Sequence, residues 1–322
     1  MATQLWQLLD LLLAGLVIGL GWATVSSREL TRSVVFFIAF GLLLAIVWAR
    51  LRAPDLALAE AAIGAGLSGA LLLSALRDEP RRTDDDILRG PVTMILSLLT
   101  LAVAATIAWV FVRTLIISDP GRLSDQIVTQ LPNSGVSNPV TAVLLNFRAY
   151  DTLLELAVLL VAVLGILALG PARKSNRASG PLLDALIRWL VPLLILTAGY
   201  LLWTGAHAPG GAFHAGATLA AAAVILRLSG HTRAGLPRPP VQRLLLIAGI
   251  SVFLLVGIAT MAAGRAFLQY PPGWSGSLIL IIESAATLAI AATLALAYIG
   301  GRPAGWRPVD SAGRSANGTE RS

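Results

Sequence analysis

Nine apolar runs, each roughly 17 to 25 residues long, divide this chain of 322 residues and constrain its fold more than any other feature. A helix needs about 20 apolar residues to cross the hydrocarbon core of a bilayer, because each residue adds about 1.5 Å. The chain is 56% hydrophobic and only 13% charged. The pattern therefore predicts an all-α fold, a polytopic transmembrane bundle of about nine helices, near 4–24, 33–49, 55–76, 91–112, 151–170, 181–203, 212–228, 241–263 and 275–299.

The Lys and Arg residues are divided unequally between the two sets of loops in such a bundle. One set contains 18 of the 24, and the other contains Arg50, Arg52, Arg113, Arg122, Arg148 and Arg265. Under the positive-inside rule this predicts an N-terminus outside the cell and a C-terminus in the cytoplasm. Because the net charge of +7 marks topology, we expect no nucleic acid among the partners.

The chain has no cysteine, which excludes disulfides, thiolate zinc sites and iron–sulfur clusters. We expect no cofactor, no metal site and no catalytic residue. Any redox chemistry would belong to partner subunits, so the chain itself is not expected to be an enzyme.

Ionisable side chains lie inside or beside the apolar runs, where a charge costs about 2.5 to 3.5 kcal/mol at the bilayer centre. In the predicted topology they share the outer half of the membrane, and if the helices converge they would line a hydrated half-channel for protons or cations. Alternatively, shallow carboxylates only snorkel or pair with arginines, which we favour for Asp10, Asp55 and Asp151. The candidates are Asp10, Asp55, Glu60, Asp151, Glu155, Glu283, His207 and His214.

Small residues surround Glu60 in the sequence, among them Gly64, Gly66 and Gly69. Such a helix lets neighbours approach closely, so we expect it inside a bundle with Glu60 buried in protein. Glu60 and Glu283 lie too deep to snorkel easily, and we therefore favour a role in ion or proton transfer for both.

The stretch NFRAYDTLLE contains a second group of charges. Asp151 and Glu155 are four residues apart and share a helix face, with Arg148 one turn earlier. One interpretation is a capped helix start, with Asp151 near the positive end of the helix dipole. The other is that Glu155 exchanges protons while Arg148 and Asp151 hold its entry in place.

The stretch WTGAHAPGGAFHAG contains a loop between two predicted spans. Pro209, Gly210 and Gly211 break the helix there. Backbone N–H groups beside a following helix N-terminus can bind an anion or water, although such a loop is more often only a tight turn. His207 is able to titrate near physiological pH, but we favour a hydrogen-bonding anchor.

Three motifs resemble known membrane proteins. Residues 53–66, APDLALAEAAIGAG, resemble the PDxALTEAxxGAG signature in the C-terminal part of the large A subunit of Mrp-type multisubunit cation/proton antiporters. Related membrane-bound hydrogenases carry this module as a small separate subunit. Residues 135–155, GVSNPVTAVLLNFRAYDTLLE, resemble the NxVTAILxDFRxxDTxxE stretch that follows it. Residues 205–216, GAHAPGGAFHAG, resemble the GHxxPGGGFxGG signature of the MnhB-like B subunit.

The resemblance implies that the C-terminal module of an A subunit is fused to a B subunit. The implied modules are a three-helix module at 1–80, a two-helix module with an outer loop at 81–175 and a four-helix MnhB-like module at 176–300. Outside the resemblance, the composition of residues 301–322 predicts a disordered cytoplasmic tail. The chain departs from the family pattern at Ala59, Pro139, Asn146, Leu154 and Ala212.

The resemblance also assigns site residues by position. Glu60 and Glu155 match the membrane carboxylates of the motifs. Together with the residue arguments, the expected ion or proton pathway comprises Glu60, Glu155, Glu283, Asp151, Arg148 and Asp55. The expected loop motif comprises His207, Pro209, Gly210, Gly211, Phe213 and His214.

The single lysine, Lys174, is predicted in a cytoplasmic loop, whereas the large antiporter-like subunits of this superfamily use membrane-buried lysines. We therefore expect an accessory, ion-pathway subunit of a multisubunit Na⁺/H⁺ antiporter in the inner membrane of a prokaryote. Its expected partners are other Mrp-type subunits, the lipid bilayer, Na⁺ and H⁺. The alternatives are a membrane-arm subunit of a hydrogenase-like or other complex I-related oxidoreductase and a purely structural helix-packing subunit.

Overall fold

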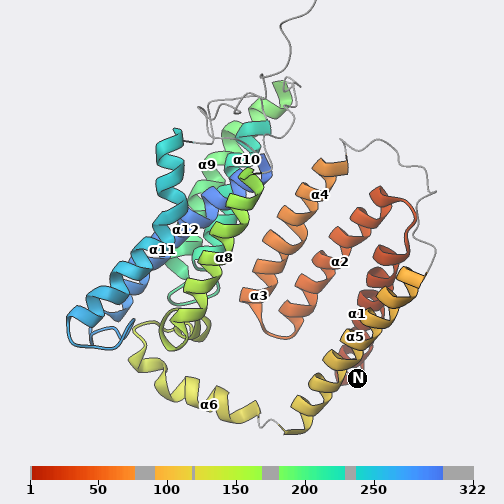
Figure 1. Ribbon diagram of the computed structural model, residues 1–322, viewed down its shortest axis with the longest axis horizontal. Coiled ribbons are helices and arrows are strands. Elements are labelled where there is room, and N and C mark those ends of the chain that lie inside the picture. Colours follow the sequence, from red (N-terminus) through yellow and green to blue (C-terminus); the bar gives the residue numbers. More distant parts are fainter. Residues whose placement is uncertain (1, 77–90, 118–119, 169–180, 229–236, 300–322) are drawn as a thin grey trace, which may run out of the picture.

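A computed structural model describes residues 2–76, 91–117, 120–168, 181–228 and 237–299 (Figure 1). These residues form helices and connecting turns, with no strand among them. The all-α expectation is therefore confirmed for the described part of the chain. The expected tail at 301–322 lies outside it, as do the expected module boundaries near 80, 175 and 300.

The N-terminal part consists of α1 (Ala2–Ser26), α2 (Leu30–Arg50) and a third span that starts at Pro54. This third span is α-helical over α3 (Pro54–Ala59), π-helical over Glu60–Leu67, and α-helical again over α4 (Ser68–Leu76). Helix α5 (Pro91–Ile117) follows.

The middle part contains short elements that the apolar pattern did not predict. Helix α6 (Pro120–Gln130) leads into a 3₁₀ turn (Leu131–Asn133). Helix α7 (Pro139–Ala142) continues into a second π-helical segment (Val143–Phe147). The long helix α8 (Ala149–Ala168) then begins.

The C-terminal part consists of α9 (Pro181–Thr204), α10 (Ala212–Leu228), α11 (Pro239–Ala262) and α12 (Ser275–Ile299). Proline stands at the first position of several helices, where its missing N–H costs nothing and its fixed φ suits the helix. These prolines are Pro54, Pro91, Pro120, Pro139, Pro181 and Pro239.

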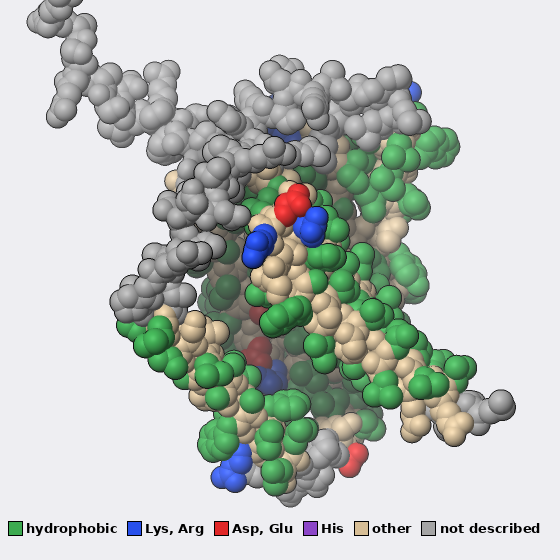
Figure 2. Space-filling model, turned by 90° about the vertical axis from the view of Figure 1, so that its right-hand side faces the viewer, with side chains coloured by type: hydrophobic (Ala, Val, Ile, Leu, Met, Phe, Trp, Pro, Cys, Tyr) green, Lys and Arg blue, Asp and Glu red, His purple; other side chains and the backbone are tan. Residues whose placement is uncertain are grey.

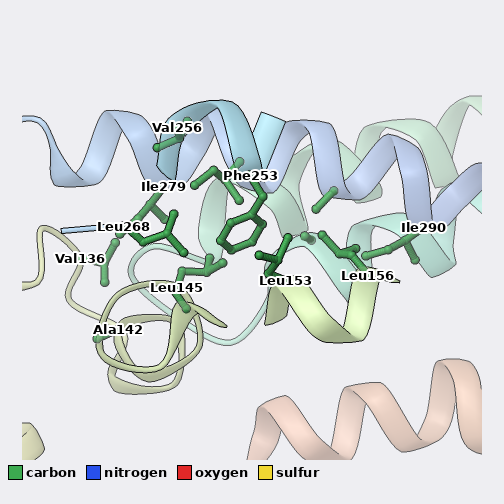
Figure 3. Packing of buried hydrophobic residues seen from close by; sticks show 14 of the residues in the cluster. Val136, Ala142, Leu145, Leu153, Leu156, Phe253, Val256, Leu268, Ile279 and Ile290 are labelled. Atoms are coloured by element: carbon green, nitrogen blue, oxygen red, sulfur yellow. The ribbon is translucent and has the colours of Figure 1, made fainter. Parts of the chain in front are cut away.

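Helix α12 is the centre of the C-terminal part, and it packs against α8, α9, α10 and α11. Figure 3 shows Phe253 of α11 among Leu153 of α8, Ile279 of α12 and Leu145 of the second π-helical segment. Phe253 is completely buried. Burial of apolar side chains around α12 therefore fixes the positions of the helices that surround it.

The helices at the other end of the molecule are largely exposed. In the described part of the chain, 61% of the apolar span of α12 is buried, compared with 6% of α1 and none of α5. Hydrophobic side chains cover most of the described surface on the side of α1 and α5 (Figure 2). Such a surface suits lipid or the helices of other subunits.

Eight helices in the described ranges are long and apolar enough to cross a membrane, and Ala212–Arg227 of α10 is a shorter apolar helix. The nine expected runs therefore correspond to eight long helices and one short one. This confirms a polytopic helical membrane protein. The orientation of its termini stays a prediction.

Candidate ion-pathway site at a glycine loop

The loop between α9 and α10 is folded tightly back on the end of α9. The carbonyl of Leu201 accepts the N–H groups of Gly205 at 3.2 Å and Gly211 at 2.8 Å. Gly211 has a φ of +91°, which favours glycine. A Cβ on Gly210 would lie 2.5 Å from the Leu201 oxygen. The two glycines of the expected loop motif are therefore required by the turn.

The NPVTA stretch of the second motif supports this loop from the side. Asn138 donates its side-chain N–H groups to the carbonyls of Gly205 at 3.2 Å and Ala208 at 3.0 Å. Thr141 donates its hydroxyl to Gly205 at 2.5 Å, and both side chains are buried. Asn138 also accepts the Val140 N–H, so it caps α7.

The first motif reaches the same loop from α3. Asp55 Oδ1 accepts the N–H of Gly210 at 3.1 Å. The ring of His214, in the first turn of α10, lies 2.5 Å from the Gly210 oxygen through Nδ1 and 2.9 Å from the Asp55 backbone oxygen through Nε2. Three motifs that are far apart in the sequence thus meet at residues 205–214.

Glu283 of α12 lies behind the loop. It is 2% exposed, and the Ala212 N–H donates to its carboxyl group. A Cβ added to Gly211 would lie 2.9 Å from Glu283 Oε1, and one added to Gly205 would lie 3.4 Å from it. The other oxygen, Oε2, is buried without a hydrogen-bond partner among the described residues. The glycine loop therefore leaves room for this carboxyl group.

Glu60 begins the π-helical segment of the third span. Its side chain is half-buried and lies against two glycines, because a Cβ on Gly41 of α2 would come within 3.2 Å of Glu60 Oε1 and a Cβ on Gly64 would collide with it. Small residues do lie against Glu60, but the expectation that protein buries it is wrong for the chain alone, because only 11% of the Pro54–Leu76 span is buried. π-Helical turns are frequent at functional sites, so the position of Glu60 at the start of one keeps it a candidate.

The remaining acidic candidates are at or near the surface. Arg148 pairs with Asp151 at 2.6 Å, and Arg50 pairs with Asp10 at 2.9 Å. These pairs agree with the structural interpretation of both aspartates. Glu155 is exposed on α8, so the chain alone does not enclose it.

The other members of the loop motif have packing roles. His207 Nδ1 lies 3.1 Å from the hydroxyl of Ser137, and its ring meets the edge of Trp203 with centroids 6.3 Å apart. These contacts suit a hydrogen-bonding anchor. Phe213 packs against the main hydrophobic cluster, and Pro209 is half-buried in the turn.

Sequence reasoning missed two residues that shape the site, Asn138 and Thr141. The Asn-Pro pair was an available signal, because Asn before Pro at the first helical position is a typical N-cap. No local signal predicts that both side chains hold a loop more than 60 residues away.

The site contains a buried carboxyl group, that of Glu283, with one oxygen that has no hydrogen-bond partner among the described residues. No group of three or more His, Asp or Glu side chains able to hold a metal ion exists in the described ranges. A buried carboxyl group with an unpartnered oxygen favours a proton, a water molecule or a monovalent cation over the bare charge. The arrangement is therefore suited to reversible binding of small cations.

Two family models match the two segments of the chain that contribute residues to the site. Residues 15–81 match the MbhD family, described as the D subunit of MBH, and residues 182–301 match the domain related to the MnhB subunit of the Na⁺/H⁺ antiporter. The first match contains Asp55 and Glu60, and the second contains the glycine loop and Glu283.

One curated relative is the A/B subunit of a probable K⁺/H⁺ antiporter from Rhizobium meliloti (strain 1021). It is 26% identical, and the match covers 80% of this chain but only 29% of the relative. The chain therefore spans less than a third of that protein's length.

Two solved structures have a similar fold. The Mrp complex from Dietzia sp. DQ12-45-1b matches with a TM-score of 0.71 and 24% identity, over 92% of this chain and 35% of the other. The membrane-bound sulfane sulfur reductase, an archaeal respiratory complex, matches with a TM-score of 0.52 and 24% identity, over 65% of this chain and 97% of the other. Taken with the fold, these matches show that the chain joins a segment that matches the MbhD family to a domain that matches the MnhB-related family.

Proposed function

We propose that the chain is an accessory, ion-pathway subunit of a multisubunit monovalent cation/proton antiporter in the inner membrane of a prokaryote. The functions described for its MnhB-type family and for the curated antiporter relative support this assignment. The chain contains a single lysine, so other subunits must supply any lysine-based ion relay. In this proposal it works with Mrp-type partners, and any redox chemistry belongs to those partners.

The observation that carries the proposal is the burial of Glu283. A carboxyl group about 12 Å along a membrane-spanning helix, with one oxygen that has no hydrogen-bond donor among the described residues, is costly unless a proton or a cation binds it. Protons and Na⁺ or K⁺ compete for the same oxygens. Exclusive binding of one or the other is what couples two gradients.

Within this proposal the other residues have graded roles. Glu60 serves as a second exchanging carboxyl group, and Glu155 becomes a third once partner subunits cover α8. Arg148 and Asp151 fix the entry to Glu155 through their ion pair. Asp55 holds Gly210 in place. Asp55 and Glu60 lie near the start of the third span, and Arg148, Asp151 and Glu155 lie near the start of α8. The glycine loop likewise lies at the start of α10.

We also propose the orientation and the modules that the sequence indicates. The sparsely basic side of the bundle, with the glycine loop and Asp55, faces outside, and the C-terminus is cytoplasmic. The modules are 1–80, 81–175 and 176–300. Reporter fusions after residue 76 and after residue 228 test the orientation, because both should be cytoplasmic.

The function is tested in the complete complex. Glu283→Gln removes the exchanging proton while keeping the shape of the side chain, so cation/proton exchange in everted vesicles should be lost for both Na⁺ and K⁺. The matched control is Ser284→Ala, because Ser284 is half-buried beside Glu283 and its hydroxyl donates to the Leu280 carbonyl of its own helix. Copurification of the partners verifies assembly. Full exchange by an assembled Glu283→Gln complex would refute the proposal.

A second candidate is a membrane-arm subunit of a respiratory oxidoreductase. The match of residues 15–81 to a component of MBH and the fold of the sulfane sulfur reductase favour it. Copurification discriminates the two, because metal-cluster subunits would accompany the chain only in an oxidoreductase.

A further inference from the structure

The His214 ring is placed between two backbone carbonyls that belong to different parts of the chain. Nδ1 faces the Gly210 oxygen at 2.5 Å and Nε2 faces the Asp55 oxygen at 2.9 Å. The ring is 8% exposed. Gly210 lies in the MnhB-type domain and Asp55 in the MbhD-type segment. The histidine therefore bridges the two family segments.

A neutral imidazole donates one hydrogen bond, whereas a carbonyl oxygen only accepts. With the neutral ring, one of the two carbonyls would face a nitrogen lone pair. The imidazolium carries an N–H on both nitrogens and satisfies both carbonyls at once. The geometry therefore fits the charged ring, and loss of its proton removes one of the two bonds.

The surrounding charged groups are consistent with this assignment. The elements packed against α10 contribute Asp55 from α3, Glu60 from the π-helical segment and Glu283 from α12. On α9, Arg188 lies about four turns from the loop. No described acidic group forms an ion pair with His214. The Asp55 carboxylate is occupied by the Gly210 N–H, so the two carbonyls are the direct partners of the ring.

We propose that His214, as an imidazolium, is a positioning residue that ties the Asp55–Glu60 segment to the glycine loop in front of Glu283. This inference rests on the proposed function for its role in exchange, but the tie itself is independent of transport. Protonation holds the two carboxyl-bearing segments together, and deprotonation loosens the start of the third span. Both hydrogen bonds form at low pH, and the tie is weakened to one of them as pH rises.

Hydrogen–deuterium exchange of the intact complex tests the tie without measuring transport. Peptides covering residues 53–67 should exchange about tenfold more slowly in the wild type than in His214→Gln at about pH 5.5, and the difference should be smaller at about pH 8.5. Comparing variants at one pH removes the intrinsic pH dependence of exchange. Gly199→Ala is the control, since Gly199 lies on α9 outside the three motifs and a Cβ there meets nothing within 4 Å, and it should behave as wild type.

A second measurement is the pH profile of cation/proton exchange. The wild type and Gly199→Ala should exchange cations more slowly on the alkaline side, while His214→Gln should be slower at low pH and lack that change. Equal deuterium uptake by wild type and His214→Gln at about pH 5.5, or the same difference at both pH values, would overturn the tie. A confirmed tie with unchanged transport profiles would overturn only its role in the exchange.

Discussion

The two ends of this molecule treat their membrane carboxyl groups differently. Around α12 the C-terminal helices enclose Glu283, which is 2% exposed and faces a tight glycine loop. At the other end α1, α2 and the third span leave Glu60 half-buried, and only 11% of the span of α2 is buried. The C-terminal part therefore builds its own low-dielectric site. The N-terminal part needs lipid or partner subunits to complete the surroundings of Glu60.

The largest expected effect is on stability, and it compares side-chain packing at the two ends of the molecule. Phe253→Ala should lower the free energy of unfolding by about 3–5 kcal/mol, because it empties a fully buried position between α8, α11 and α12. Trp22→Ala in α1, where the side chain is 76% exposed, should change it little. Thermal unfolding of the detergent-solubilised chain measures both. Equal losses would remove the contrast between the packed and the open end.

The next effect concerns the loop in front of Glu283. Gly211→Ala should cost about 1–2 kcal/mol, because its φ of +91° disfavours a side chain and the new Cβ would press on Glu283 Oε1. Gly199→Ala in α9 meets nothing within 4 Å and should be neutral or slightly stabilising. Only Gly211→Ala should lower both the midpoint of thermal unfolding and the rate of cation/proton exchange in vesicles. A stable, active Gly211→Ala complex would show that the loop is not fitted to the carboxyl group.

A smaller effect is expected at the contact between the α11–α12 loop and the second π-helical segment. Tyr270 is buried, its hydroxyl donates to the Leu145 carbonyl at 2.9 Å, and burial raises the pKa of that hydroxyl. Tyr270→Phe should cost about 1 kcal/mol through the lost hydrogen bond. A shift in the unfolding midpoint measures it, and no shift would mean that water replaces the tyrosine.

The smallest stability effect is expected beside Glu60. Gly64→Ala should change the free energy of unfolding by less than about 1 kcal/mol, because the gain in helix propensity offsets the crowding. It should nevertheless slow cation/proton exchange several-fold, since the new Cβ displaces the Glu60 carboxyl group. Gly19→Ala in α1 meets nothing within 4 Å and should leave exchange intact. Unchanged exchange in Gly64→Ala would remove Glu60 from the pathway.

The apolar pattern predicted the long helices well, because span length is set by bilayer thickness and by composition. The sequence did not predict the π-helical segment that starts at Glu60, since its register depends on packing against α2 and not on local propensity. It also missed α6, whose residues form no long apolar run.

The candidate site could be predicted in part. Asp55, His214 and the loop glycines were candidates from their motifs, but their contacts join residues about 155 apart, which no spacing rule supplies. Glu155 was expected in a pathway, yet the chain alone leaves it exposed. The sequence of one chain does not show which surface of a partner subunit would cover Glu155.

The central claim is that the Glu283 carboxyl group binds protons and the transported cation in turn. Labelling of the active complex with a hydrophobic carbodiimide, followed by mass spectrometry of the peptides, tests this directly. The exposed Glu29, 3.6 Å from Arg32, serves as the internal control and should stay unmodified. The account predicts an adduct on Glu283 that decreases as Na⁺ or K⁺ is added. An active complex in which Glu283 stays unmodified, or is modified equally at every cation concentration, would contradict it.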